Sequence, residues 1–228
     1  MWLSRARLLV AVFWAGSLWT IGYLVAPTLF ATLHDSALAG TIVGSLLARE
    51  AWVSIICAAL LFILVSTARS IDAVHPMMGV QGRLPAARML VAVFWAGALW
   101  VLGYIAAPAV FGVVSGPLAG DIVGTFLRRL AWISFACAAL MLVLVRVSPD
   151  LDAGRRRSLS MLALAMLACA LVIFVGLQPG MAHLRELAGP AGVRASPYWT
   201  QFAVMHGVSQ LFHIVQSLLG AWLIVRLR

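Results

Sequence analysis

The sequence is poor in charged residues, and this scarcity decides its class. Only 10% of the 228 residues are charged, whereas 64% are hydrophobic. A soluble domain carries about 25% charged residues. This chain therefore has too little polar surface to cover a soluble globule, and lipid must cover the rest. The composition predicts an integral membrane protein with no soluble domain of any size.

Lysine is absent and acids are few. All sixteen basic residues are arginines, and they lie mostly between apolar runs, where orientation in a bilayer requires them. The net charge of +9 therefore predicts no nucleic-acid partner. Of the seven acids only Glu50 lies near a membrane segment, and no nucleophile, base and orienting residue can be grouped. The sequence has no glycine-rich phosphate loop, zinc spacing or nucleotide motif, so it gives little support for an enzyme.

Cysteine is scarce as well. Cys57, Cys137 and Cys169 stand inside apolar runs, without a CxxC or other ligand spacing. We expect these three to be small buried core residues.

Long apolar runs are what the chain has in quantity. A helix needs about 20 apolar residues to cross the hydrocarbon core. The qualifying runs are Leu8 to Leu33, Leu46 to Val65, Met89 to Val114, Leu130 to Val145, Leu159 to Leu177 and Phe202 to Val225. The second and fourth could begin earlier, near Gly40 and Gly120. The sequence predicts an all-α bundle of six transmembrane helices that forms a single membrane domain over residues 1–228.

The arginines predict the orientation. If six helices alternate, eleven arginines fall on the side of both termini and five on the other side. The eleven are Arg5, Arg7, Arg69, Arg83, Arg88, Arg146, Arg155, Arg156, Arg157, Arg226 and Arg228. By the positive-inside rule both termini are cytoplasmic, in a multi-pass protein of a bacterial-type inner membrane.

A helix pair occurs twice in the chain. Residues 10–30 (VAVFWAGSLWTIGYLVAPTLF) match residues 91–111 (VAVFWAGALWVLGYIAAPAVF), and residues 38–60 match residues 118–140. Roughly two thirds of the aligned positions are identical, which chance does not produce. The copies span residues 8–66 and 89–146, both enter the membrane in the same direction, and a C-terminal helix pair follows at residues 158–228. The recurrence argues against a cleaved signal peptide at the start.

The two copies share glycines and an arginine. Gly40-x-x-x-Gly44 recurs as Gly120-x-x-x-Gly124, a spacing that lets two helix backbones approach closely. We expect helix packing here rather than a ligand site. Arg49 recurs as Arg129, each three residues before a tryptophan. Interface anchoring explains this pair, and a paired site for an anionic substrate is the alternative.

The last helix carries a polar stripe. At about 100° per residue, its polar side chains fall within one arc, opposite an apolar face. The members of this polar seam are His206, Ser209, Gln210, His213, Gln216 and Ser217. Because lipid takes the apolar face, we expect the seam to point into the bundle, where ionisable residues are functional candidates.

Three interpretations of the seam stay open. Its side chains could hydrogen-bond neighbouring helices, its histidines could bind haem or a metal, or they could relay protons. His206 and His213 lie about 10 Å apart along the axis, so one metal ion cannot bind both. His183 could reach His206, and Met181 beside His183 suits copper in an oxidising compartment.

Several motifs resemble one family of membrane proteins. They are Gln178-Pro179-Gly180-Met181 with Leu184-Arg185, then Phe202-x-x-x-His206-Gly207-x-Ser209, and in the second copy Trp95/Gly97, Ala107-Pro108/Phe111 and Ala119-Gly120/Gly124. This pattern resembles the transmembrane protein 205-like family, also described as domain of unknown function 4149, over residues 91–228. The first helix pair is extra to that pattern, and His213 stands where the family often has Asn. More loosely, the chain is similar to membrane proteins of the copper-resistance D type and to four-helix haem-binding protoporphyrinogen oxidases.

The resemblance implies a membrane protein of unsettled activity. Together with the seam it favours a non-enzymatic role in small-solute or metal handling, or as an accessory subunit. The wider kinship implies the alternative, a redox protein that binds b-type haem or copper. A homo-oligomer or a partner within a membrane complex fits both.

Overall fold

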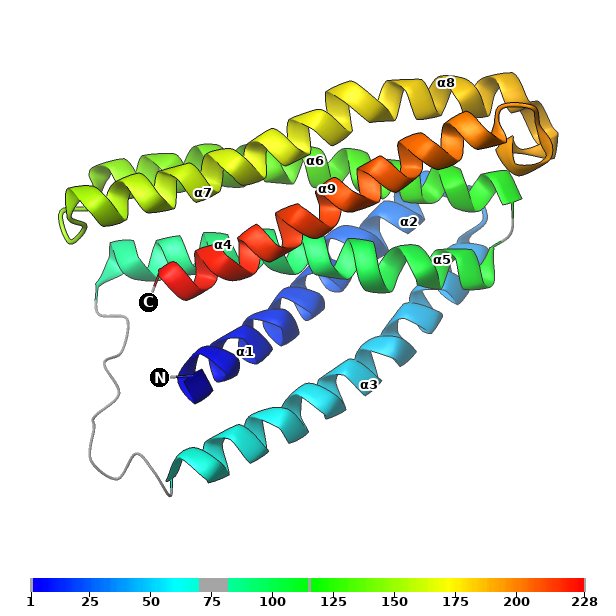
Figure 1. Cartoon of the computed structure of the whole chain (residues 1–228). Coiled ribbons are helices and arrows are strands. Elements are labelled where there is room, and N and C mark those ends of the chain that lie inside the picture. Colours follow the sequence, from blue (N-terminus) through cyan, green and yellow to red (C-terminus); the bar gives the residue numbers. More distant parts are fainter. Residues whose placement is uncertain (1, 70–81, 115, 228) are drawn as a thin grey trace.

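The computed structural model describes residues 2–69, 82–114 and 116–227, and helices make up almost all of this part of the chain (Figure 1). Six segments are long and apolar enough to cross a membrane. They are α1 (Trp2–Thr20) with η1 (Ile21–Val25) and α2 (Ala26–Thr32); α3 (Ser36–Arg69); α4 (Arg83–Val101) with η2 (Leu102–Ala106) and α5 (Ala107–Val113); α6 (Gly116–Val147); α7 (Ala153–Leu171) with η3 (Val172–Leu177) and α8 (Gln178–Ala188); and α9 (Trp199–Arg226). Two short helical turns, η4 (Gly189–Ala191) and η5 (Val193–Ala195), join α8 to α9. The predicted six-helix all-α class is confirmed.

Two helices begin earlier than their apolar runs. The earlier starts near Gly40 and Gly120 are closer to the structure than Leu46 and Leu130, because α3 begins at Ser36 and α6 at Gly116. Asp35 caps α3, since its carboxylate accepts the backbone N–H groups of Ala37 and Leu38 at 2.8 and 3.1 Å. The added turns of α3 pack inward through Ala39 and Ile42, both fully buried.

Each odd-numbered span widens into a π-helical turn before a proline. The turns η1, η2 and η3 directly precede α2, α5 and α8, whose second residues are Pro27, Pro108 and Pro179. A proline ring clashes with the carbonyl four residues earlier and offers no N–H. The backbone N–H of the residue before each proline donates instead to the carbonyl oxygen five residues back, as the N–H of Ala26 does to the carbonyl of Ile21. A π turn is the local response.

The first helices of the two copies cross at their glycines. A Cβ on Gly16 would lie 2.6 Å from the Cα of Gly97, and one on Gly97 would lie 2.5 Å from the Cα of Gly16. Only glycine allows α1 and α4 to approach this closely. The α4 helix is the centre of the bundle, and its Trp95 is fully buried.

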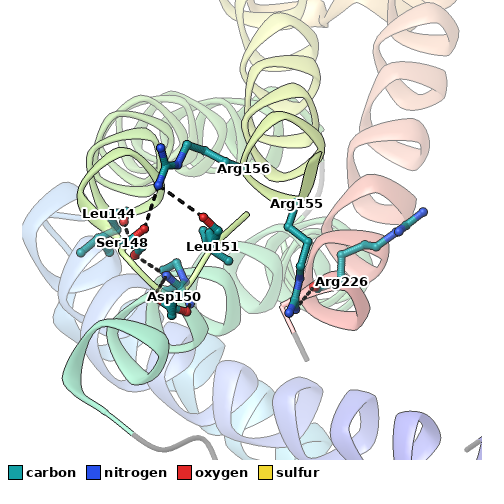
Figure 2. A network of polar contacts seen from close by, with 8 residues as sticks. Leu144, Ser148, Asp150, Leu151, Arg155, Arg156 and Arg226 are labelled. Carbon is teal, nitrogen blue, oxygen red and sulfur yellow. Dashed lines mark hydrogen bonds and ion pairs between the residues drawn. The ribbon is translucent and has the colours of Figure 1, made fainter. Parts of the chain in front are cut away.

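Both termini lie at one end of the bundle, which we call the terminal end (Figure 1). The short connection from α6 to α7 belongs to this end and is built from polar bonds (Figure 2). The buried guanidinium of Arg88 on α4 bonds Ser148 and both carboxylate oxygens of Asp150, at 3.1 and 2.5 Å. Arg156 Nη2 donates to the carbonyls of Ser148 and Leu151 at 3.0 and 3.4 Å. These bonds fix α4 to the turn.

Candidate functional site

The predicted seam of the last helix divides into a buried and an exposed part. Ser209, His213, Gln216 and Ser217 are all less than 7% exposed, facing the bundle. The outer members, His206 and Gln210, are exposed instead. The bundle therefore encloses the seam from Ser209 to Ser217, apart from Gln210.

The imidazole of His213 is enclosed by α4. Its Nε2 atom lies 3.1 Å from the carbonyl oxygen of Leu99, and the ring stands edge-on to Tyr104 at 5.6 Å between centroids. The ring also fills the space beside Gly103, where a Cβ would clash with the imidazole. The absence of a side chain at Gly103 therefore makes room for His213.

The other buried seam residues bond to the same surroundings. Gln216 Nε2 donates to the carbonyl of Met166 on α7 at 3.1 Å. Ser217 accepts from two aromatic side chains, at its hydroxyl from Tyr104 and at its carbonyl from Trp100, both at 3.3 Å. These bonds tie α9 to α4 and α7, and they favour the hydrogen-bonding interpretation of the seam.

The predicted ligand residues differ in their surroundings. His183 is exposed, with Glu186 at 4.0 Å as its nearest acid, while Met181 is buried. His206 stacks on Phe202, with 6.0 Å between ring centroids. Within the described ranges, three or more His, Cys, Asp or Glu side chains nowhere gather into a possible metal site. His213 is enclosed against a carbonyl, and a ligand role of His206, His183, His213 or Met181 for haem or copper stays a prediction.

The shared glycines and arginines have different surroundings in the two copies. In the second copy, Arg185 Nη1 donates to the carbonyl of Gly120 at 2.9 Å, and the same guanidinium lies beside Gly124. In the first copy, neither Gly40 nor Gly44 has a described neighbour within 4 Å of where a Cβ would stand. Arg49 and Arg129 are both exposed on their helices. A guanidinium, not a second helix backbone, therefore covers the Gly120 motif.

A buried polar cluster lies between α1 and α3, where the sequence predicted no site. Glu50 is only 3% exposed, and it stands at the midpoint of the span Ser36–Leu64. The side chains around it come from the same face of α1 and from the next turn of α3. The Glu50 cluster consists of Trp14, Ser17, Glu50 and Ser54, and the buried Thr20 lies three residues after Ser17 on α1.

The hydrogen bonds of the Glu50 cluster converge on one carboxylate oxygen. The Ser17 hydroxyl lies 2.7 Å from Glu50 Oε1 and 2.8 Å from the carbonyl of Trp14. Ser54 lies 3.5 Å from the same Oε1 and accepts from Trp14 Nε1 at 2.9 Å. Within the described part of the chain, Glu50 Oε2 and Thr20 Oγ1 are buried without a hydrogen-bond partner. Such groups are rare in protein interiors and indicate a strained or functional site.

The Glu50 cluster has two hydrogen-bonding arrangements, which differ in the direction of the bond between Ser17 and Glu50. A hydroxyl has one hydrogen, so Ser17 can donate to the Trp14 carbonyl or to Glu50, but not to both. If Glu50 carries a proton, it can donate to the Ser17 oxygen while Ser17 donates to Trp14. If Glu50 is ionised, Ser17 must turn its hydrogen toward the carboxylate. A proton on Glu50 therefore reverses the bond that joins α3 to α1.

One family matches the chain. The family described as "Domain of unknown function (DUF4149)" matches residues 9–82 and 90–189, which is more than half of the chain. The chain belongs to the DUF4149 family. Among curated proteins and among solved structures, none matches the chain. The DUF4149 match takes in both copies of the helix pair and ends before the last helix.

The second copy within this DUF4149 chain keeps one bond of the cluster and lacks the rest. Trp95 Nε1 donates to the Ser134 hydroxyl at 3.1 Å, the counterpart of the bond from Trp14 to Ser54. Leu130, Ala98 and Val101 stand where the first copy has Glu50, Ser17 and Thr20. The tryptophan–serine bond is therefore common to both copies, whereas the carboxyl and its hydroxyls are special to the first.

One feature of the sequence could have indicated this site. Aligning the two copies shows Glu50 opposite Leu130, an acid opposite an apolar residue within otherwise similar helices. The difference between copies, rather than the residues that they share, marks the carboxyl.

Proposed function

We propose that this DUF4149 protein is a non-enzymatic, multi-pass protein of a bacterial-type inner membrane that handles a small solute with a proton bound at Glu50. Both termini lie in the cytoplasm. The terminal end carries most of the arginines, in line with the positive-inside rule. The polar seam of the last helix holds the bundle together, and the Glu50 cluster is the functional site.

One observation carries the proposal: a buried carboxyl in mid-span has an oxygen without a partner. An isolated carboxylate is costly in an apolar interior, and acids in membrane spans commonly take part in proton relays. The Glu50 carboxyl bonds hydroxyls rather than arginine, and Arg49 beside it faces the exposed side of α3. The hydroxyl groups of Ser17 and Ser54 can each donate or accept a hydrogen bond, so they suit both protonation states of the Glu50 carboxyl.

The proton would act on the pairing of α1 with α3. Ser17 and Trp14 on α1 exchange donors and acceptors with Glu50 and Ser54 on α3. Much of the rest of α3 faces outward, as Trp52, Ile55 and Ile56 do, each more than half exposed. A helix held by few polar bonds can shift when one of these bonds reverses. Through such a shift of α3, protonation of Glu50 would affect the path of the solute.

An infrared titration of the reconstituted protein tests the proton site. We expect a carboxyl absorption band that changes with pH in the wild type and is lost in Glu50→Gln. The triple variant Glu50→Leu, Ser17→Ala, Thr20→Val is the matched control for folding, because the second copy carries these residues at the same positions. It should remain folded and lack the band.

Proteoliposomes with a trapped pH-sensitive dye test the handling of solutes. Under an imposed membrane potential, a panel of small solutes should change the internal pH with wild-type protein and not with Glu50→Gln. If the carboxyl band is identical in Glu50→Gln, Glu50 is not the proton site. If the band is lost but solute-dependent pH changes persist, the proton site is not coupled to transport.

A further inference from the structure

One face of α1 is open, although the matching face of α4 is covered. This open face consists of Ala15, Leu18, Trp19, Gly22 and Tyr23. Leu18 is 48% exposed, whereas its counterpart Leu99 is fully buried. Gly22 has open space where a Cβ would stand. Trp19 also forms one wall of an apolar groove of about 390 Å³ between α1, α4 and α6.

The second copy shows what covers this face, because all five counterparts touch α9. His213 lies against the carbonyl of the leucine and fills the space beside the glycine. Ser217 accepts from the tryptophan and the tyrosine, and a Cβ on Gly220 would lie 3.2 Å from that of the alanine. The counterparts are Ala96, Leu99, Trp100, Gly103 and Tyr104.

The residues of the open face are the same in both copies, although their surroundings differ. Between residues 15 and 23 the copies differ only at Ser17, Thr20 and Ile21, which are buried against other helices. All five residues of the open face are identical to their counterparts in α4. The α9 helix is already engaged, since it bonds α4 and α7. The first copy therefore presents the residues that bind a helix such as α9 without such a helix on them.

Acyl chains alone do not suit the open face. Trp19 and Tyr23 lie about 20 Å and about 13 Å along the helix axis from Thr32, inside the span Leu3–Thr32. The Trp19 indole N–H and the Tyr23 hydroxyl donate to no acceptor among the described residues. A donor without an acceptor is costly in hydrocarbon, and tryptophan and tyrosine otherwise gather at the membrane interface. A helix that offers a hydroxyl and a carbonyl, as Ser217 does to α4, satisfies both donors.

The direction of α9 argues against a symmetric dimer at this face. The α4 helix starts at the terminal end, whereas α9 ends there, so the two helices are antiparallel (Figure 1). Two copies of the chain in one membrane have parallel α1 helices. Contact between their open faces would therefore not reproduce the packing of α9 on α4.

We infer that the open face of α1 binds a transmembrane helix of a second membrane protein, antiparallel to α1. The face of that helix resembles α9: a serine or threonine, a histidine or amide four residues before it, and a glycine or alanine three residues after it. These are the relations of Ser217 to His213 and Gly220. The chain is thus one subunit of a membrane complex. This inference does not depend on the Glu50 site, which bonds Ser17 on another face of α1.

Binding of a synthetic α9 peptide to the full-length protein tests this inference. The probe is the segment Trp199–Arg226, labelled with an acceptor dye and titrated into donor-labelled protein in lipid bicelles. Energy transfer to the wild type should be saturable. Gly22→Leu fills the space that a histidine of the bound helix would take, so it should raise the apparent Kd about tenfold, as overpacking does. A peptide with Gly220→Leu should show a similar loss with the wild-type protein.

Gly207→Leu is the matched control, since Gly207 is an exposed helical glycine with open space around it, outside the open face. This variant should bind the peptide as the wild type does. Equal affinities of Gly22→Leu and Gly207→Leu would overturn the site. If Gly22→Leu does not fold, Tyr23→Phe, which removes only the hydroxyl, gives the same comparison.

Two other occupants of the open face are outcomes of the same experiment. If the wild type dimerises without peptide and Gly22→Leu is monomeric, a second copy covers the face, and the inference of a different partner is wrong. If the wild type stays monomeric and the peptide does not bind it, lipid covers the face, and the inference is also wrong.

Discussion

At the residue scale, the duplication supplies a counterpart for Gly103, the glycine beside His213. A Cβ at Gly103 would lie 2.9 Å from Cδ2 of the imidazole and would clash with Nε2, whereas Gly22, at the same position of the first copy, has open space around it. We expect Gly103→Ala to displace His213 from the Leu99 carbonyl and to destabilise the protein by about 1–3 kcal/mol, as overpacking does. The Tm of the purified variant measures this loss.

Gly22→Ala is the control for that experiment. Alanine favours a helix over glycine by about 0.5–1 kcal/mol, so this variant should be neutral or slightly more stable. If both variants lower the Tm equally, backbone geometry in the π turns explains the loss, and His213 does not.

The residues of the Glu50 cluster show why the sequence predicted the seam more readily than this site. His213 and Gln216 stood out because they interrupt an apolar helix with a helical spacing. In the sequence Glu50 stands near the start of a span, because the apolar run begins at Leu46. The ten earlier residues of α3, which Asp35 caps, place Glu50 in mid-span. Hydropathy alone misses such helical turns, since polar residues there are compensated by packing.

At the element scale, the apolar runs predicted the number of spans but not their irregular turns. Pro27 and Pro108 occupy the same position in the two copies, and Pro179 belongs to the motif of the last segment. The structure gives the three one physical role, because each follows a π turn in the first helix of a pair. Periodicity could not show this, since a π turn leaves the apolar composition unchanged.

The turn between α6 and α7 depends on one ion pair at this scale. The Arg88 guanidinium, which bonds the Asp150 carboxylate, holds the pKa of that acid below its usual range. A carboxyl with a depressed pKa in the folded state contributes stability above its unfolded pKa and loses it as the pH falls through the folded value. Asp150→Asn should lower stability at pH 7 by about 1–2 kcal/mol, a reduced figure because Asp150 is partly exposed.

The pH dependence separates this contribution from other effects of the substitution. Wild type and Asp150→Asn should differ most in Tm at neutral pH. The difference should shrink as the pH falls below the ordinary aspartate pKa of about 4 and then through the lowered pKa of Asp150 in the folded protein. Asp121→Asn, which changes an exposed acid at the opposite end of the bundle, should leave the Tm unchanged. If the difference in Tm between wild type and Asp150→Asn is the same in acid as at neutral pH, the ion pair does not cause that difference.

At the scale of the whole molecule, the last helix breaks the similarity of the two copies. Trp100 and Tyr104 bond Ser217 of α9, whereas their counterparts Trp19 and Tyr23 are 37% and 82% exposed. The sequence shows that the two copies are alike but not that α9 packs mainly on the second. That asymmetry follows from chain connectivity, because the C-terminal pair comes directly after the second copy and packs on it through α6 and α7.

The orientation of the whole bundle gives the final prediction. Six spans place both termini on one side, as Figure 1 shows, and eleven arginines in the sequence favour the cytoplasm for that side. A reporter fused after the last residue should therefore give a cytoplasmic signal. In a background with the three buried cysteines replaced by serine or alanine, His34→Cys, in the turn between α2 and α3 at the opposite end, should react with a membrane-impermeant thiol reagent added to intact cells. Labelling only after lysis, together with a periplasmic signal from the fusion, would reverse the orientation.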